Sequence, residues 1–441
     1  MMKKRTLQWL ILSLLLTSCG TLPSPPTATR APTFTPAPPP ATLAPSVTPS
    51  PAPKTQPTAI TLPTPNADQI AVLERLRMVY VKEGNLYVQD GVNPPRQLTY
   101  DGQNISFASN VSDDGEKIVF FKGQNSENLY SINGDGTQEL LLLNGSILAS
   151  LNLGYPKEFK PEVPVFVSNT HQILFVTAWS NDLLLVDTDT AKIEIKRSAK
   201  PDKVEHFLVS PDGKLVAIQS PRQVKVVDLA GRIVHNALIT YTYPPDFGFY
   251  PVDLHWASDA SILFALPPRE WNSSIYENSA PRTIWKCPLN GGSPIELQLV
   301  PPPLDDDYAI SSDGKWIVYF YYPYSSLTDT DLGVTAGIYL GNLQDGTTKL
   351  MTSEAENGQF FQWSPDNIHF TFNQNGNQQI LGNINGELTL RKEVWNFYGW
   401  VDASHYLFGN IELGEINRET ILKLSEGGIP SFVLLKSSTE K

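Results

Sequence analysis

A single thiol near the N-terminus is placed where covalent chemistry could occur. Cys19 directly follows the small residues Thr17 and Ser18, and an apolar run at 7–16 comes after a basic start at 3–5. This order is the layout of a secretory signal with its cleavage point. The apolar run is shorter than the roughly 20 residues needed to span a bilayer. The spacing therefore predicts a nucleophilic thiol at the membrane surface, where the leader is cut.

The tetrapeptide Leu-Thr-Ser-Cys at 16–19 resembles the lipobox of bacterial lipoproteins. In that family a diacylglycerol is attached to the cysteine, the preceding peptide is removed, and the cysteine becomes the first residue. The resemblance implies a signal peptide at 1–18, a palmitate-type lipid on Cys19, and a location at the extracytoplasmic face of the cell membrane. If the host has an outer membrane, that membrane is an alternative location. An ordinary signal peptide with a chance cysteine is the alternative.

The segment that follows is a predicted stalk. In residues 21–65, 15 of 45 positions are proline, and most of the others are Thr, Ala or Ser. Such a segment cannot bury enough apolar surface to offset chain entropy. Proline-rich chain favours extended polyproline II, at ~3.1 Å per residue. We therefore expect residues 19–66 to be a disordered linker and residues 67–441 to form the folded domain.

Composition limits the function of that domain. The formal net charge is −12, and only two cysteines occur in 441 residues. The acidity argues against nucleic acid as a partner. Because Cys19 is expected to be acylated, Cys287 has no partner for a disulfide and is predicted to be a buried structural thiol. The fold must therefore depend on an ordinary apolar core, and we expect a monomer.

An internal repeat organises the chain after residue 66. A short helical segment is predicted at 67–77, and short strands broken by Gly, Asn, Asp and Pro follow it. The segments 112–120, 210–218 and 311–319 match one another, each with Ser at the start, Asp-Gly in the middle and a β-branched or aromatic run at the end. Weaker copies begin at Ser168, Ser258, Ser364 and Asp402.

The repeat has a simple physical meaning. Asp-Gly favours tight turns because such turns need φ > 0, and Ser or Asp side chains bind backbone N–H groups within the turn. Each box therefore predicts the bend between a first and a second strand. Four strands per ~45 residues, repeated, indicate a β-propeller. We expect a single all-β propeller of eight blades, with seven as the alternative, closed by residues 431–435 pairing with N-terminal chain.

The boxes at 210–214 (Ser-Pro-Asp-Gly-Lys) and 363–367 (Trp-Ser-Pro-Asp-Asn) resemble the repeats of TolB-like propellers, a WD40-like class also seen in relatives of prolyl oligopeptidase. The resemblance covers about residues 78–436 and implies the fold rather than a function. TolB itself has an α/β domain before its propeller. Here only the short segment 67–77 precedes the first strand, so a role in the Tol system is not carried over.

Catalytic and metal motifs are scarce. The sequence has no Gly-x-Ser-x-Gly, no His-Glu-x-x-His and no Cys-x-x-Cys. The histidines are scattered, and those at 206, 255 and 369 are predicted to be structural. Acidic runs at 305–307 and 329–331 lack the full pattern of a calcium loop and are interpreted as solvated loops, with calcium binding as the alternative. We therefore expect no cofactor and no enzymatic activity.

One feature points to recognition. Two long connections in neighbouring repeats, 267–282 and 321–335, contain Trp271, Tyr276, Tyr322 and Tyr324. Exposed Trp and Tyr supply large contact areas with a polar tip. These four residues form the candidate binding patch, unless they fold back onto the blade edges. The sequence thus favours a binding or scaffolding module for a protein, peptide or polysaccharide partner. An envelope glycosidase or lyase with its site in the propeller funnel is the alternative.

Overall fold

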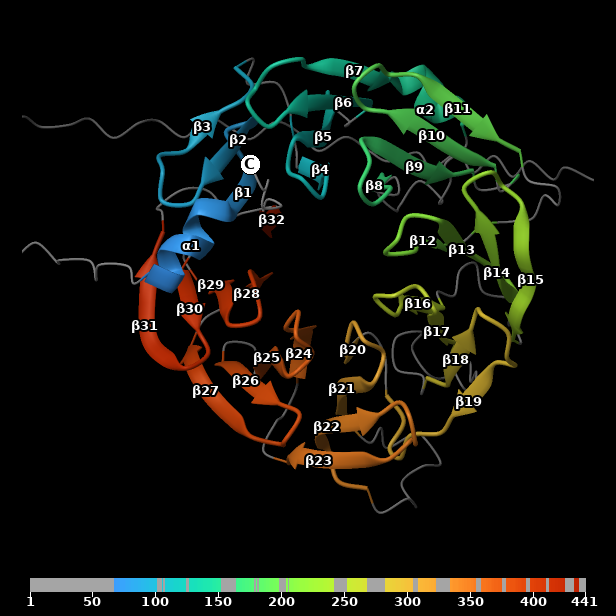
Figure 1. The fold of residues 1–441 in the computed structure, drawn as a ribbon, viewed down its shortest axis with the longest axis vertical. Coiled ribbons are helices and arrows are strands. Elements are labelled where there is room, and N and C mark those ends of the chain that lie inside the picture. Colours follow the sequence, from blue (N-terminus) through green and yellow to red (C-terminus); the bar gives the residue numbers. More distant parts are fainter. Residues whose placement is uncertain are drawn as a thin grey trace, which may run out of the picture. The chain divides into compact units, whose positions relative to one another are not determined.

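Each Asp-Gly repeat folds into a four-stranded antiparallel sheet, and eight such sheets form a ring in the computed structural model (Figure 1). The structure describes residues 67–435, except 101–104, 106–107, 124–126, 152–163, 178–179, 181, 198–203, 205, 242–251, 268–281, 304–307, 323–333, 354–357, 375–377, 394–396, 410–411 and 425–431. The signal peptide, Cys19 and the proline-rich segment lie outside these residues. The prediction of eight blades is confirmed.

The blades are numbered in chain order, and each is given from its innermost strand outward. Blade 1 has β32 (Phe432–Leu435), β1 (Leu76–Lys82), β2 (Asn85–Asp90) and β3 (Arg96–Gln97). Blade 2 has β4 (Ala108–Val111), β5 (Lys117–Lys122), β6 (Asn128–Asn133) and β7 (Leu140–Leu143). Blade 3 has β8 (Val165–Phe166), β9 (Gln172–Val176), β10 (Leu183–Asp187) and β11 (Ile193–Lys196). Blade 4 has β12 (His206–Val209), β13 (Leu215–Ser220), β14 (Gln223–Asp228) and β15 (Ile233–Thr240).

The second half of the ring repeats this arrangement. Blade 5 has β16 (Asp253–Trp256), β17 (Ile262–Leu266), β18 (Ile284–Pro288) and β19 (Ile295–Leu297). Blade 6 has β20 (Tyr308–Ile310), β21 (Trp316–Tyr321), β22 (Gly337–Asn342) and β23 (Thr348–Thr352). Blade 7 has β24 (Gly358–Trp363), β25 (His369–Gln374), β26 (Gln378–Asn383) and β27 (Leu388–Glu393). Blade 8 has β28 (Phe397–Trp400), β29 (His405–Phe408), β30 (Glu412–Glu415) and β31 (Arg418–Lys423).

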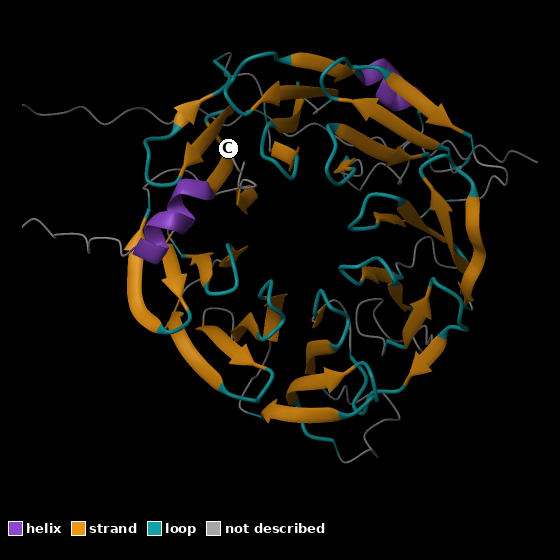
Figure 2. Ribbon diagram, in the orientation of Figure 1, coloured by secondary structure: helices purple, strands orange, loops and turns teal. Residues whose placement is uncertain are grey.

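The described residues contain two helices, α1 (Ala67–Arg75) and α2 (Gly145–Ser150) (Figure 2). The sequence predicted the first of them at 67–77, two residues too long. Leu76 and Arg77 instead begin β1, where they pair with Leu435 and Leu434 of β32. Pairing with a distant strand thus ends the helix earlier than its local pattern indicates. The second helix connects β7 to β8 and was not predicted.

The C-terminal strand closes the ring. β32 pairs antiparallel with β1, from Leu76 opposite Leu435 to Val79 opposite Phe432. Blade 1 therefore receives its innermost strand from the far end of the chain, as expected from the run at 431–435. This closure leaves neither side of blade 1 without a neighbouring blade.

The turn between the first and second strands has the same hydrogen bonds in four blades. In blade 2, Ser112 Oγ donates to Asp114 Oδ1 over 2.6 Å and accepts the Lys117 N–H over 2.9 Å. The same Asp114 oxygen accepts the Glu116 N–H at 2.9 Å. Equivalent bonds occur at Ser210 with Asp212, Ser311 with Asp313, and Ser364 with Asp366. The turns fold because the Ser and Asp side chains satisfy the backbone locally.

Blade 5 departs from the repeat at the left-handed position of this turn. The left-handed residue is Gly115, Gly213 or Gly314 in three of the turns, at φ between 67° and 74°, but it is Ala260 in blade 5, at φ 56°. A left-handed backbone costs an L-residue roughly 1–2 kcal/mol. We therefore expect Ala260→Gly to raise the free energy of unfolding by about 0.5–1 kcal/mol, after allowance for the greater entropy of glycine in the unfolded chain. Thermal denaturation measures the gain, and a fall in Tm would contradict this prediction.

The seams between blades contain the core. Seven apolar clusters of eight to eleven buried residues each join neighbouring blades. Cys287 belongs to the cluster between blades 4 and 5 and has no exposed surface. Burial raises the pKa of its thiol to about 12. The prediction that this cysteine is a buried structural thiol is therefore confirmed.

Candidate functional site

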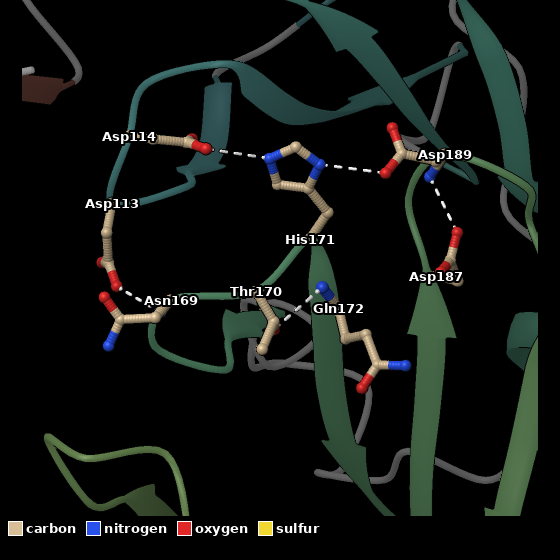
Figure 3. A pocket seen from close by; sticks show the side chains of 8 residues that line it. All are labelled: Asp113, Asp114, Asn169, Thr170, His171, Gln172, Asp187 and Asp189. Atoms are coloured by element: carbon tan, nitrogen blue, oxygen red, sulfur yellow. Dashed lines mark hydrogen bonds and ion pairs between the residues drawn. The ribbon is translucent and has the colours of Figure 1, made fainter. Parts of the chain in front are cut away.

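An open pocket of about 580 Å³ lies at the seam between blades 2 and 3 (Figure 3). The residues that line it come from three turns: Asp113 and Asp114 from the β4–β5 turn, Asn169, Thr170, His171 and Gln172 around the β8–β9 turn, and Asp187 and Asp189 from the β10–β11 turn. In an antiparallel blade these turns lie at the same end of the strands. We call the face of the ring that carries them the turn face.

His171 is the centre of this pocket. Its Nδ1 lies 2.9 Å from Asp189 Oδ2, and its Nε2 lies 3.0 Å from Asp114 Oδ2. Ionised carboxylates only accept hydrogen bonds, and only the protonated imidazole can donate from both nitrogens. The geometry therefore suits a charged imidazolium between two carboxylates. With both nitrogens engaged, His171 is not placed to act as a general base.

Lys117 extends the chain of charges. Its Nζ lies 2.5 Å from Asp189 Oδ1, and its side chain is only 3% exposed. The charges thus alternate along Asp114, His171, Asp189 and Lys117. Asp114 and Lys117 belong to blade 2, while His171 and Asp189 belong to blade 3. This series of alternating charges therefore crosses the seam between the blades twice. It is an electrostatic clasp between the two blades.

The clasp shifts the pKa values of its members. Burial acts to lower the pKa of His171, but hydrogen bonds and charges from Asp189 and Asp114 outweigh it and raise that pKa above its ordinary value. Burial acts to raise the pKa of Asp114, which is nevertheless lowered by bonds from Ser112, the Glu116 N–H and His171. The pKa of Asp189 is lowered in the same way against burial, by Lys117 and His171.

These shifts predict a pH dependence of stability. A histidine whose pKa is raised on folding stabilises fully below its unfolded pKa of about 6.5, and this contribution is lost as pH rises through the folded pKa. Between pH 6 and pH 8.5, we expect the Tm of the wild-type protein to fall further than the Tm of His171→Gln. His405, whose pKa is raised chiefly by its hydrogen bond to Asp402, contributes equally to both curves. Parallel Tm curves for the two proteins would contradict the prediction.

The acidic side of the pocket retains unused hydrogen-bonding capacity. Asp113 Oδ2 accepts the Asn169 N–H at 2.9 Å, and Asp187 Oδ1 accepts the N–H groups of Asp189 and Thr190. Within the described part of the chain, the other oxygen of each carboxylate has no partner. Four carboxylates line the pocket, and its nearby basic groups include His171, Lys117 and Lys192, of which Lys192 is paired with Glu194. Such a surface attracts cations and repels anions.

The structure describes one of the four residues of the aromatic patch expected from the sequence. Tyr322 is 52% exposed and its ring stacks near Phe320, with 6.5 Å between ring centroids. Trp271, Tyr276 and Tyr324 lie outside the described residues, as do the acidic runs at 305–307 and 329–331. Tyr322 follows β21 on the face opposite the turn face. The patch therefore stays a prediction; Tyr322, its one described member, does not line the acidic pocket.

Sequence reasoning missed the acidic pocket although it identified each of the turns. His171 and Asp114 are 57 residues apart, and neither lies in a recognisable catalytic or metal motif. The available signal was positional. Acidic residues followed Ser112 in one repeat, while the next repeat carried His171 directly after its own turn and Asp189 after its third strand. Turns at the same strand ends of neighbouring blades must lie side by side.

Across residues 67–435, apart from the gaps given above, no three or more His, Cys, Asp or Glu side chains are grouped to hold a metal ion. No helix in the same residues is long and apolar enough to cross a membrane.

Comparison with known proteins shows a shared fold. No protein-family model and no curated sequence matches this chain. Among solved structures, a eukaryotic initiation factor is 12% identical, with 82% of this chain and 85% of that chain covered at a TM-score of 0.52. An oligogalacturonate lyase in complex with manganese is 14% identical (69% and 81% covered, TM-score 0.40), and TolB from Acinetobacter baumannii is 14% identical (74% and 81% covered, TM-score 0.33). At 12% identity the likeness to the initiation factor is one of fold alone, and the chain is a β-propeller.

Proposed function

We propose that this protein is a lipid-anchored, extracytoplasmic binding module that holds a partner by a basic group placed in the acidic pocket. The observation that carries the proposal is the pocket itself: Asp113 and Asp187 each keep one carboxylate oxygen without a partner in the described structure, beside a clasp that occupies the nearby histidine. A lysine or arginine side chain, or another amine, has the donors and the charge that these oxygens lack.

Binding of a lysine peptide tests this proposal. Tetralysine should bind the full-length protein, and the same peptide acetylated on its side chains should not. Asp113→Asn with Asp187→Asn keeps the oxygens that accept backbone N–H groups but removes both charges. Because a hydrogen bond to a charged group contributes about 1.5–3 kcal/mol, we expect Kd to rise at least tenfold.

A matched variant guards against a general charge effect. Asp345→Asn changes the same kind of turn in blade 6, where Asp345 Oδ1 accepts the Thr347 N–H and hydroxyl, and should leave Kd unchanged. Equal affinity for the acetylated peptide would contradict a basic-group site. Turnover of a glycan, lost on a single carboxylate change, would replace the binding module with the enzyme alternative.

The anchor has its own test. Cys19→Ala removes the thiol that would receive the lipid, so we expect the protein to leave the membrane fraction and appear in the medium or periplasm. Fractionation followed by immunoblotting measures this release. Metabolic labelling with a fatty acid should mark the wild-type protein and not the variant. Continued membrane association of Cys19→Ala would argue against acylation.

A further inference from the structure

The seam between blades 7 and 8 differs in composition from the other seven. Each of the others contains eight to eleven buried apolar residues. Here the apolar cluster among the described residues has two fully buried members, Tyr406 and Phe408, with Phe397 and Trp400 packed against them. All four aromatic residues belong to blade 8.

Blade 7 presents three polar side chains toward these aromatic rings, together with the buried Leu381, which is paired with Thr371. Asn373 of β25 lies opposite Gln379 of β26, and Thr371 lies two residues before Asn373. Directly paired residues, and residues two apart on a strand, project from the same face of a sheet. The alternate residues Phe370 and Phe372 belong to the cluster with blade 6. Thr371, Asn373 and Gln379 therefore project toward blade 8.

These three polar side chains are buried, and four of their polar atoms have no hydrogen-bond partner among the described residues. Thr371, Asn373 and Gln379 are 1%, 4% and 0% exposed. Thr371 Oγ1, Asn373 Oδ1 and both polar atoms of the Gln379 amide make no hydrogen bond within the described part of the chain. Leaving such an atom unpaired costs more than a typical hydrogen bond contributes, so native proteins satisfy them with protein groups or with internal water.

The chemistry of these atoms identifies the ligand class. Oδ1 of Asn373 and Oε1 of Gln379 accept hydrogen bonds, whereas Nε2 of Gln379 donates them. A metal ion requires acceptors alone and an anion requires donors alone, while a water molecule supplies both. We propose that the seam between blades 7 and 8 is a binding site for internal water, in which shared molecules bridge the amides of Asn373 and Gln379 and the hydroxyl of Thr371.

A crystal structure of the full-length protein gives the direct test. We expect ordered water within about 3.2 Å of the Gln379 amide and Asn373 Oδ1. A direct hydrogen bond between the two amides, with no water between them, would overturn the proposal. So would a peak with the short distances and multiple oxygen ligands of a metal ion.

A double-mutant cycle tests the sharing of water in solution. If the same molecules serve both amides, Asn373→Leu or Gln379→Met alone leaves the other amide without its partner, and each should lower Tm by about 2 °C or more. The double variant, which leaves no amide to satisfy, should lower Tm by less than the sum. Additive shifts, or a rise in Tm in both single variants, would overturn the proposal. Ser131→Ala calibrates the scale, because that buried hydroxyl donates directly to Thr188 O at 2.8 Å.

Discussion

Removal of residues 425–441 is expected to abolish cooperative folding of the ring. The deletion takes away β32, so β1 loses its pairing partner from Leu76 to Val79. Met78 and Val79, now 1% and 0% exposed, would then border an open edge. Burying one apolar side chain contributes about 1.5–3 kcal/mol, and several are involved here. The loss is therefore comparable to the whole stability of an ordinary domain, about 5–15 kcal/mol.

The matched control is a shorter deletion. Removal of 436–441 keeps β32 and should leave the unfolding transition unchanged. Differential scanning calorimetry should show one sharp transition for this control and a broad or absent one for the longer deletion. Because an unpaired strand edge promotes association, size-exclusion chromatography should also show aggregates of the longer deletion alone. A sharp transition at the wild-type temperature after loss of β32 would show that closure of the ring by β32 is dispensable.

Arg77→Ala is expected to be the most destabilising single substitution of a charged residue among those described. Arg77 Nε and Nη2 donate to both oxygens of Asp90 at 2.7 and 3.0 Å, and Nη1 donates to Gly115 O in blade 2 at 2.7 Å. The arginine side chain is 9% exposed. Removing one partner of a buried pair typically costs about 3–5 kcal/mol, and because the remaining Asp90 is 28% exposed we expect the lower end of that range. Urea denaturation measures this loss.

Two comparisons separate the buried pair from charge in general. Arg232→Ala breaks a pair with Asp228 of the same 2.7 Å length, but the Arg232 side chain is 81% exposed, so we expect less than about 1 kcal/mol. Arg77→Lys keeps the charge but not the two-pronged geometry, and should recover only part of the stability. Equal effects of Arg77→Ala and Arg232→Ala would contradict this account.

The close fit around Arg77 explains a glycine in blade 2. A Cβ atom built on Gly134 would lie 2.3 Å from Arg77 Nη1 and 2.7 Å from Gly115 O. The guanidinium therefore crosses the seam where only glycine leaves room. The sequence shows Gly134 merely as part of a turn, and its role becomes visible only when blade 1 is placed beside blade 2.

Much of the fold could be predicted because its signals are local. The Ser-x-Asp-Gly turn satisfies its own backbone within six residues, as at Ser112 and Asp114, so each copy marks a strand boundary by itself. The closing strand was predictable because the first repeat lacked one strand and an apolar run remained at the C-terminus. The end of α1 was not, because pairing of Leu76 with Leu435, at the other end of the chain, determines it.

The candidate site was less predictable because it depends on neighbouring blades. His171 reads as an isolated histidine in the sequence, and only the apposition of two turns gives it Asp114 and Asp189 as partners. The buried polar residues of blade 7 could likewise not be predicted. Thr371 and Asn373 alternate with Phe370 and Phe372, a pattern that is typical of a strand with one solvent-exposed face. Alternation shows which residues share a face, but not what covers that face.

The pairing of β32 with β1 has a mechanical consequence. The segment that precedes Ala67 enters the ring through α1 and β1, and β1 is also the strand that β32 closes. A pull on the N-terminal chain is therefore applied to blade 1 before any other blade. In blade 1 this force is resisted by the pairing of β1 with its two neighbours, six residue pairs with β2 and four with β32. When the protein is pulled from its N-terminus, we therefore expect the pairing between β1 and β32 to break first. Atomic-force spectroscopy would record the separation of these two strands as the first rupture.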